Sequence, residues 1–395
     1  MITRHLTRFL HRSKKSVLLL GPRQTGKSTL IHALHPALTI NLAHEPTYLQ
    51  FARNPAELEE RLAAGTFRTV FIDEIQRLPS LLNTIQTLLD EDRPAVKYYL
   101  TGSSARKLKR GGANLLPGRI HAYHLGPLVA SELAYRMETL RALETGTLPG
   151  IWTEADARER RKTLQTYAAT YLKEEIQVEA LTRNIEGFSR FLFVVGAEAG
   201  KFLDLSKLAG AAGIPRQSAL RFFEILEDTL VVRRCEAFRK SARRRLMQHP
   251  RVFFFDTGVL NGLLGSFETS ADRIGSLFEN LVVMQIRHTA EALDVPVRLT
   301  TYRTEHGAEV DVIVQFGKGT WAVEIKSARS LPSPDLRGFA SFAESLGKPY
   351  RAAIFYNGDQ HRRIRDVDVW PWQEGIRTMF AALAGQRDRV PLVPN

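Results

Sequence analysis

Short apolar runs alternate with amphipathic segments through the first third of the chain. Residues 17–20, 37–42, 69–72 and 96–100 are mostly apolar, and each run has the length of a buried strand. The segments between them carry apolar residues at helical spacing, as after Asn54-Pro55, a favourable start for a helix. Strands that alternate with helices in this way predict an α/β sandwich around a parallel sheet.

The pattern becomes helical and charged after Gly126. We expect helices at 131–143, 153–162 and 164–181, and a helix-turn-helix over 204–228 with its turn at Gly213. Two apolar runs, 230–238 and 251–255, have the pattern of the strands of a wing.

A different alternation follows in the last part of the chain. An amphipathic helix is expected at 274–286, and two strands at 308–314 and 321–327 should form a hairpin. We therefore predict four parts: a nucleotide-binding core at 1–125, a helical lid at 126–190, a winged helix-turn-helix at 191–255, and an α/β domain at 256–395.

The first strand leads into a glycine-rich loop, GPRQTGKS, at residues 21–28. Strand, glycine loop, Lys-Ser and helix is the context of a phosphate-binding P-loop, or Walker A motif. Gly21 and Gly26 let the backbone N–H groups turn toward an anion, Lys27 can reach the β- and γ-phosphates, and Ser28 can hold Mg²⁺. The predicted ATP-binding residues are Gly21, Pro22, Arg23, Gln24, Thr25, Gly26, Lys27, Ser28 and Thr29.

Two further strands end in polar residues that suit the same chemistry. Residues 69–72 are followed by Asp73 and Glu74, so both acids emerge at the carboxyl end of a buried parallel strand, where ligands bind. Asp73 can complete the Mg²⁺ shell, and Glu74 can polarise a water molecule. Ser103, close after the 96–100 strand, is the best candidate to sense the γ-phosphate. ATP hydrolysis with Mg²⁺ is the strongest prediction from the sequence.

Composition narrows the choice of partners. The 395 residues carry a net charge of +13 and a pI near 9.9, which favours a polyanion, with nucleic acid first and an anionic membrane second. Cys235 is the single cysteine, so an internal disulfide is impossible and a reducing compartment is expected. No signal peptide or membrane-length apolar run is present, and we expect a soluble, cytoplasmic protein.

The basic residues of the helix-turn-helix region are candidates for DNA contacts. Arg216, Gln217 and Arg221 lie at the start of its second helix, where phosphates or bases are usually contacted. The basic run between the expected wing strands adds Arg239, Lys240, Arg243, Arg244 and Arg245. Contacts of this kind should be backbone-directed and salt-sensitive. A charge run can also be a solvated face, and helix-turn-helix units also dock proteins.

The amino-terminal residues before Val17 predict a basic amphipathic helix that either caps the domain or packs beside the nucleotide base. Arg4, Arg8 and Arg12 recur at four-residue spacing and should line a different face from its apolar residues.

The hairpin near the carboxyl end carries a second set of charged residues. Asp311 lies on one strand, and Glu324 and Lys326 share one face of the other. Two carboxylates can hold a divalent cation beside a lysine that activates water. An exposed hairpin with an ordinary Glu–Lys pair is the alternative. The arrangement resembles the PD-(D/E)xK nuclease fold, and the resemblance to its junction-resolving members implies Glu279 as a third metal ligand.

The motifs at 21–28, 71–74, 100–104 and Gly118-Arg119 resemble those of AAA+ ATPases. The nearest group is the archaeal ATPase-like group with a carboxyl-terminal domain of the DUF4143 type. The resemblance implies that Arg119 is an arginine finger that acts in the site of a neighbouring subunit. It therefore also implies a ring-like homo-oligomer, expected to be a hexamer. A residue matching the family's sensor 2 arginine is not found.

These observations predict an ATP-driven AAA+ motor that acts on branched or duplex DNA, whose nuclease-like domain binds or cuts DNA. An ATP-gated switch with an inert nuclease-like domain is the alternative. A nuclease used in defence, with cleavage gated by ATP, is a third possibility.

Overall fold

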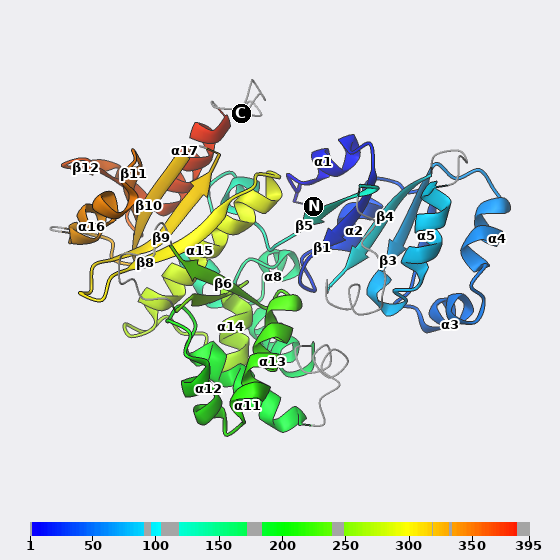
Figure 1. The fold of residues 1–395 in the computed structure, drawn as a ribbon, viewed down its shortest axis with the longest axis horizontal. Helices are drawn as coiled ribbons and strands as arrows, with labels where there is room; N and C mark the ends of the chain where they lie inside the picture. Colours follow the sequence, from blue (N-terminus) through cyan, green and yellow to red (C-terminus); the bar gives the residue numbers. More distant parts are fainter. Residues whose placement is uncertain are drawn as a thin grey trace.

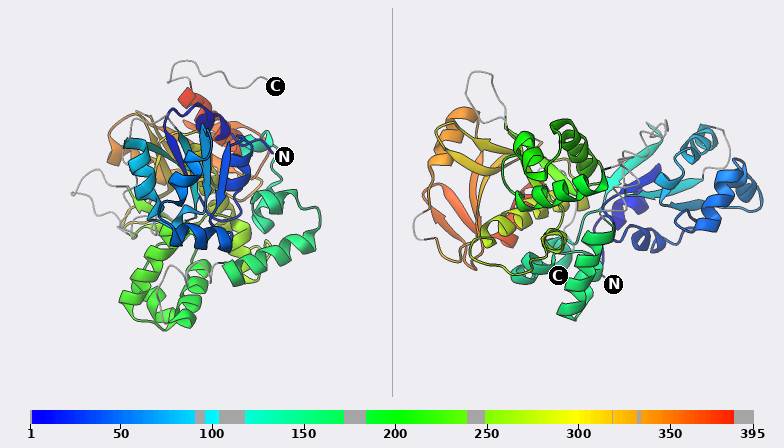
Figure 2. Two further views of the ribbon diagram at one scale, coloured as in Figure 1. Left: turned by 90° about the vertical axis from the view of Figure 1, so that its right-hand side faces the viewer. Right: turned by 90° about the horizontal axis from the view of Figure 1, so that it is seen from below.

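The computed structural model describes residues 2–90, 96–103, 118–171, 184–238, 249–317, 319–331 and 334–384. The amino-terminal part, up to about residue 125, forms one body, and the rest of the described chain lies beside it along the longest axis (Figure 1). Their two sheets lie at opposite ends of the molecule, and helices of the middle of the chain lie between them (Figure 2).

The amino-terminal body is built on a five-stranded sheet in the order β2-β3-β4-β1-β5, and every neighbouring pair is parallel. Its strands are β1 (Ser16–Leu20), β2 (Leu38–Asn41), β3 (Thr69–Asp73), β4 (Lys97–Gly102) and β5 (Ile120–His124). Its helices are α1 (Thr7–Arg12), α2 (Lys27–His32), α3 (Glu45–Arg53), α4 (Glu57–Ala63), η1 (Ile75–Arg77) and α5 (Leu81–Asp90). The predicted α/β fold with a parallel sheet is confirmed.

The side chains of β1 alternate between two apolar clusters, one on each face of the sheet. Val17 and Leu19 belong to one cluster, and Leu18 and Leu20 to the other. Successive strand residues point to opposite faces, so a continuous apolar run means that both faces are covered. This double burial fixes β1 in the interior of the sheet and places the following glycine loop at its carboxyl edge.

The second body contains an eight-stranded mixed sheet in the order β12-β13-β11-β10-β9-β8-β6-β7. Its strands are β6 (Val232–Ala237), β7 (Arg251–Phe254), β8 (Arg298–Arg303), β9 (Glu309–Phe316), β10 (Gly319–Lys326), β11 (Arg351–Tyr356), β12 (Arg362–Ile364) and β13 (Val367–Pro371). The expected hairpin is present as the antiparallel pair β9 and β10. Helix α16 (Arg337–Leu346) packs on one face, and α15 (Ile274–Ala292) and α17 (Trp372–Ala384) pack on the other.

The middle of the chain is helical and shares the core of this second sheet. Its elements are η2 (Ala130–Leu133), α7 (Thr139–Thr145), α8 (Pro149–Thr153), α9 (Ala157–Thr166), the π-turn η3 (Tyr167–Tyr171), α11 (Ile185–Ala197), α12 (Leu205–Ala212), α13 (Arg216–Asp228) and α14 (Thr257–Leu264). The helix expected at 131–143 is instead two short elements. A tight turn at Ala134 and Tyr135, both with positive φ, separates them. Residues 172–183 lie outside the described part.

The expected wing strands differ from the sequence-based picture. Both strands are present, and β6 and β7 pair antiparallel, but β6 also pairs in parallel with β8. β6 and β7 therefore extend the carboxyl-terminal sheet instead of forming a separate wing. The domain boundary expected at residue 255 directly follows β7, which is an edge strand of this sheet. One apolar cluster runs from Ala130 to Phe380, so the second body has a continuous core.

Candidate nucleotide site and acidic cluster

The P-loop lies between β1 and α2, as its sequence predicted. Gly26 has φ +88°, a conformation that residues with a Cβ rarely adopt. A Cβ on Gly21 would lie 2.2 Å from the carbonyl oxygen of Leu125, so glycine is also required there. Both positions therefore require glycine for the loop to adopt this conformation.

The ammonium group of Lys27 lies against the carbonyls at the beginning of the loop. Its Nζ donates to the oxygens of Gly21 at 2.8 Å and Pro22 at 2.9 Å, and the residue is only 5% exposed. The hydroxyl of Thr25 donates to the same Pro22 carbonyl at 2.9 Å. These bonds hold the cation within the loop, next to the backbone that a phosphate would approach.

The two predicted Mg²⁺ ligands come together although they are 45 residues apart. Ser28 Oγ donates to Asp73 Oδ1 at 3.0 Å, and Thr101 Oγ1 also donates to that carboxylate oxygen. Strand β4 lies between β1 and β3, which places Thr101 beside Asp73. Hydroxyl and carboxylate oxygens suit Mg²⁺, so this pair fits the metal of a bound nucleotide.

Glu74 and Ser103 are joined by a residue that the sequence analysis missed. Gln76 Nε2 donates to Glu74 Oε2 and, at 3.0 Å, to Ser103 Oγ. Glu74 has φ +59°, and its N–H donates to Thr101 Oγ1 at 3.3 Å. The only sequence signal for Gln76 is its place two residues after the acid. The network links the expected water-polarising residue to the expected phosphate sensor.

Arg4 is a second residue whose role the sequence did not indicate. It precedes α1 instead of belonging to the helix as expected, and it is only 9% exposed. Its guanidinium donates to the carbonyls of Thr25 and Gly126, both at 2.7 Å, and forms a 3.0 Å ion pair with Glu132, whose side chain is fully buried. Arg4 thus ties the P-loop to the first turn of the second body.

A second contact supports the same junction. The Tyr167 hydroxyl donates to the carbonyl of Arg23 in the P-loop, at 3.4 Å. The nucleotide loop is therefore in contact with the region predicted to be a lid, and that region packs against the carboxyl-terminal core.

Arg119 lies at the opposite edge of the sheet from the P-loop. Ile120 pairs with Ser16 at the amino end of β1, whereas the P-loop follows its carboxyl end. Arg119 forms an exposed ion pair with Asp90. It cannot contact its own nucleotide site from this position, and its role as a finger in a neighbouring subunit stays a prediction.

The predicted DNA contacts are described only in part. Helices α12 and α13 form the expected helix-turn-helix, with Gly213 in the left-handed conformation at the turn. Arg216, Gln217 and Arg221 are exposed at the start of α13, and Arg216 Nε donates to Ser206 Oγ at 3.2 Å. Arg239, Lys240, Arg243, Arg244 and Arg245 lie outside the described residues.

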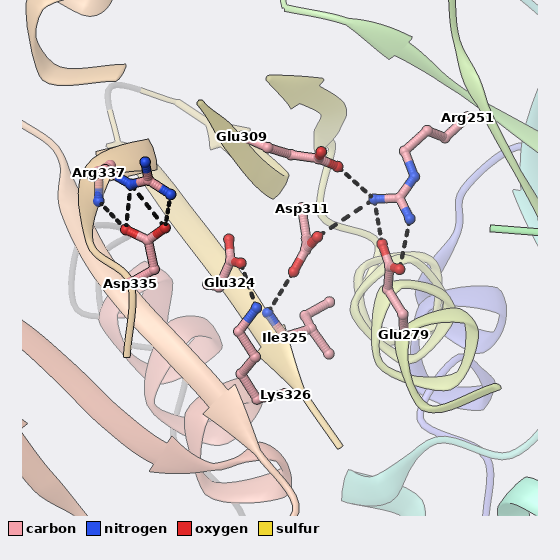
Figure 3. A network of polar contacts seen from close by, with 9 residues as sticks. All are labelled: Arg251, Glu279, Glu309, Asp311, Glu324, Ile325, Lys326, Asp335 and Arg337. Carbon is pink, nitrogen blue, oxygen red and sulfur yellow. Dashed lines mark hydrogen bonds and ion pairs between the residues drawn. The ribbon is translucent and has the colours of Figure 1, made fainter. Parts of the chain in front are cut away.

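The charged residues of the hairpin gather with Glu279 of α15, as predicted, and with Glu309 of β9 (Figure 3). We refer to Glu279, Glu309, Asp311 and Glu324 as the acidic cluster. Lys326 Nζ donates to Glu324 Oε1 at 2.7 Å. On the neighbouring strand, Asp311 Oδ2 accepts a hydrogen bond from the backbone N–H of Ile325 at 2.8 Å.

Arg251 of β7 lies within this cluster and was not predicted there. Its Nη2 donates to Glu279 Oε2 at 2.6 Å, while its Nη1 forms ion pairs with Glu279 Oε1 and, at 3.5 Å, with Asp311 Oδ1. The same Nη1 is 3.7 Å from Glu309 Oε1. One guanidinium thus contacts three of the four carboxylates.

Burial and mutual repulsion perturb these carboxyl groups. Burial, and after it the negative charge of Asp311, raises the pKa of Glu279 to about 8 and that of Glu324 to about 7. Arg251 opposes the shift of the Glu279 pKa, and Lys326 opposes that of Glu324.

The predicted metal ligands do not fit a metal ion in this arrangement. Within the described ranges, no three His, Cys, Asp or Glu side chains are grouped so that they could hold one. The guanidinium of Arg251 lies between Glu279 and Asp311, where a cation shared by the two would have to lie (Figure 3).

Comparisons with known proteins agree with the motif at the amino terminus. Residues 13–134 match the family described as AAA domain, so this part is an AAA-type ATPase domain. Two domain families of unknown function, DUF8612 and DUF4143, match residues 137–270 and 274–374. Uncharacterized proteins of Mycobacterium bovis and Mycobacterium tuberculosis are each 28% identical over 374 residues, which cover 92% of this chain and 81% of the relative.

Similarity to solved structures is weak. NtrX from Brucella abortus, in complex with ATP, is 13% identical with a TM-score of 0.24, over 56% of this chain and 66% of NtrX. A Signal Transduction ATPase with Numerous Domains from Pyrococcus horikoshii is 12% identical with a TM-score of 0.23. The similarity covers 74% of this chain and 48% of the Pyrococcus chain. These scores are too low to establish a shared fold. No helix of the described residues combines the length and hydropathy needed to cross a membrane.

Proposed function

We propose that this protein is an AAA-type ATPase that hydrolyses ATP with Mg²⁺ and couples the reaction to DNA. The observation that carries the proposal is the convergence of Ser28 with Asp73 at the mouth of a P-loop. The AAA domain match over residues 13–134 supports the same activity.

Each residue of the nucleotide site has a distinct task in this proposal. The loop N–H groups and Lys27 bind the phosphates, and Ser28 with Asp73 holds Mg²⁺, which neutralises charge on the phosphate oxygens. Glu74 orients and polarises the attacking water, and Gln76 fixes its carboxylate beside Ser103, which contacts the γ-phosphate.

Assembly completes the site. Arg119 supplies a positive charge to the nucleotide of the neighbouring subunit in a ring-like homo-oligomer, for which we propose a hexamer. A finger supplied in trans is worth about 10³ to 10⁵ in rate, so hydrolysis should depend on protein concentration.

DNA is the proposed partner because the chain is strongly basic and α13 presents exposed cations. The net charge is +13, and Arg216 and Arg221 lie on the exposed first turns of that helix. Contacts to the phosphate backbone would make binding weaken steeply with salt. Branched or duplex DNA is the proposed substrate, and the cytoplasm the proposed location.

Hydrolysis assays test the proposal directly. ATP turnover is measured with Mg²⁺ alone, and then with single-stranded, duplex and four-way-junction DNA at two salt concentrations. We expect stimulation by duplex or junction DNA that declines at the higher salt. Turnover that is the same in every mixture would contradict the coupling to DNA but leave the ATPase intact.

Arg251 favours one alternative, an ATP-gated switch with an inert nuclease-like domain, because this arginine lies among the predicted metal ligands. A motor is stimulated by DNA of arbitrary sequence, whereas a switch that binds an operator is not. A defence nuclease would lose DNA cleavage in Asp311→Ala and Glu324→Ala, and any cleavage that survives both changes would exclude these residues from it.

A further inference from the structure

Every carboxylate of the acidic cluster already has a charged or polar partner inside the protein. Both oxygens of Glu279 contact the guanidinium of Arg251, and one oxygen of Glu324 accepts from Lys326. The Asp311 carboxylate is shared, with Oδ1 near Arg251 and Oδ2 on the backbone N–H of Ile325. A divalent ion would have to displace these partners to bind.

Arg251 is held firmly in this place. Its Nε donates to the carbonyl of Gly200 at 2.6 Å, and the residue is only 6% exposed. Its backbone belongs to β7, opposite Cys235 of β6, and its guanidinium carbon lies 5.4 Å from the ring centre of Phe253. A side chain anchored at both its Nε and its fork cannot leave without breaking buried hydrogen bonds.

The charges of the cluster fit a single, fixed guanidinium better than a metal. An arginine remains protonated at any pH at which proteins fold, and its planar fork matches a carboxylate in two parallel bonds. The fork of Arg251 contacts both oxygens of Glu279, Oε2 through a hydrogen bond and Oε1 through an ion pair. A divalent ion instead needs several oxygen ligands around one point, and the guanidinium of Arg251 occupies the point between Glu279 and Asp311.

We propose that Arg251 takes the place of a divalent cation in the acidic cluster, so that the carboxyl-terminal domain is a metal-free relative of a nuclease. The arginine compensates Glu279 and Asp311 permanently, and the cluster serves to join β7, α15 and β9. The domain then does not cut DNA. The proposal stands independently of the ATPase activity.

The test is a gain of metal binding when the arginine is removed. Full-length wild type, Arg251→Met and Arg303→Met are titrated with MnCl₂ by calorimetry without nucleotide. Arg303 is the matched control, because it is 3.6 Å from Glu309 but contacts neither Glu279 nor Asp311 in the described interactions. Any background from the nucleotide site is common to the three proteins.

We expect Arg251→Met to gain a Mn²⁺ site at least tenfold tighter than any site in wild type or Arg303→Met. Adding Glu279→Gln and Asp311→Asn to Arg251→Met should remove it again. If Arg251→Met binds no more Mn²⁺ than wild type, the arginine is not what excludes the metal, and the proposal fails.

A second measurement keeps the test decisive if Arg251→Met does not fold. The melting temperature of wild type is measured with Mn²⁺ and with EDTA, beside that of Glu279→Gln. We expect no difference between Mn²⁺ and EDTA for wild type. A rise with Mn²⁺ that Glu279→Gln abolishes would show that a cation displaces Arg251, and it would overturn the proposal.

Discussion

In the nucleotide site, Ser28 donates directly to Asp73, and the Lys27 ammonium stays on the carbonyls of its own loop. In the acidic cluster, by contrast, Glu279 and Asp311 are joined through the guanidinium of Arg251. Both sites combine carboxylates with a basic side chain. Lys27 contacts the loop carbonyls, whereas Arg251 lies between its carboxylates. We propose that only the first arrangement leaves oxygen ligands for Mg²⁺.

The origin of the base explains the difference. Lys27 belongs to the P-loop itself, six residues from the Gly21 carbonyl that it contacts. Arg251 comes from a strand 28 residues from Glu279 and 60 from Asp311. A local base is positioned by the geometry of its loop, whereas a distant base is positioned by the packing of three separate elements.

The largest expected effect is at the local base. Lys27→Ala should lower ATP turnover about 10³-fold, because it would remove the charge that we propose to bind the phosphates. The measurement is steady-state hydrolysis with Mg²⁺, and Lys14→Ala, an exposed lysine, is the control. Turnover within tenfold of wild type would show that the P-loop is misassigned.

Removing Arg4 should lower the free energy of unfolding substantially. Arg4→Ala leaves the buried Glu132 carboxylate without its charged partner and should cost about 3 kcal/mol. Urea unfolding measures this loss, with the exposed Arg12→Ala as the control, for which a change below about 0.5 kcal/mol is expected. Adding Glu132→Gln should restore part of the loss, and a double variant no more stable than Arg4→Ala would argue against the ion pair.

A matched pair of aspartates compares the two sites directly. Asp73→Asn should lower Mg²⁺-dependent hydrolysis about 10²-fold, because it would remove a carboxylate that we propose to hold Mg²⁺. Asp311→Asn, the same change in the acidic cluster, should leave hydrolysis within twofold. Equal losses in both variants would mean that the acidic cluster participates in ATP chemistry, and the contrast between the sites would disappear.

The smallest effect is expected at Gln76. Gln76→Ala frees the Glu74 carboxylate from Ser103, and turnover should fall about tenfold through a lower kcat at nearly unchanged KM. Gln76→Glu should be worse than Ala, since it places a like charge beside Glu74. A change confined to KM would instead assign Gln76 to nucleotide binding.

The sequence predicted which residues lie together at the candidate nucleotide site, because its signals are local. The glycine loop follows one apolar run, and Asp73 and Ser103 end two others, so parallel pairing brings all three to one edge. The sequence did not predict that the second body shares one sheet and one continuous apolar cluster. β6 and β7 read as an isolated wing, since nothing in their own residues shows that β6 also pairs with β8.

By itself, the sequence determined the amino-terminal α/β sandwich, the P-loop with its acidic partners, and the hairpin that carries Asp311 and Glu324. Tertiary structure alone decided which arginine side chains contact the P-loop and the carboxylates. Arg4 lies 128 residues from Glu132, and Arg251 reaches its carboxylates from another strand. Periodicity and motif spacing report contacts within a few residues, whereas an ion pair between distant segments depends on how whole elements pack.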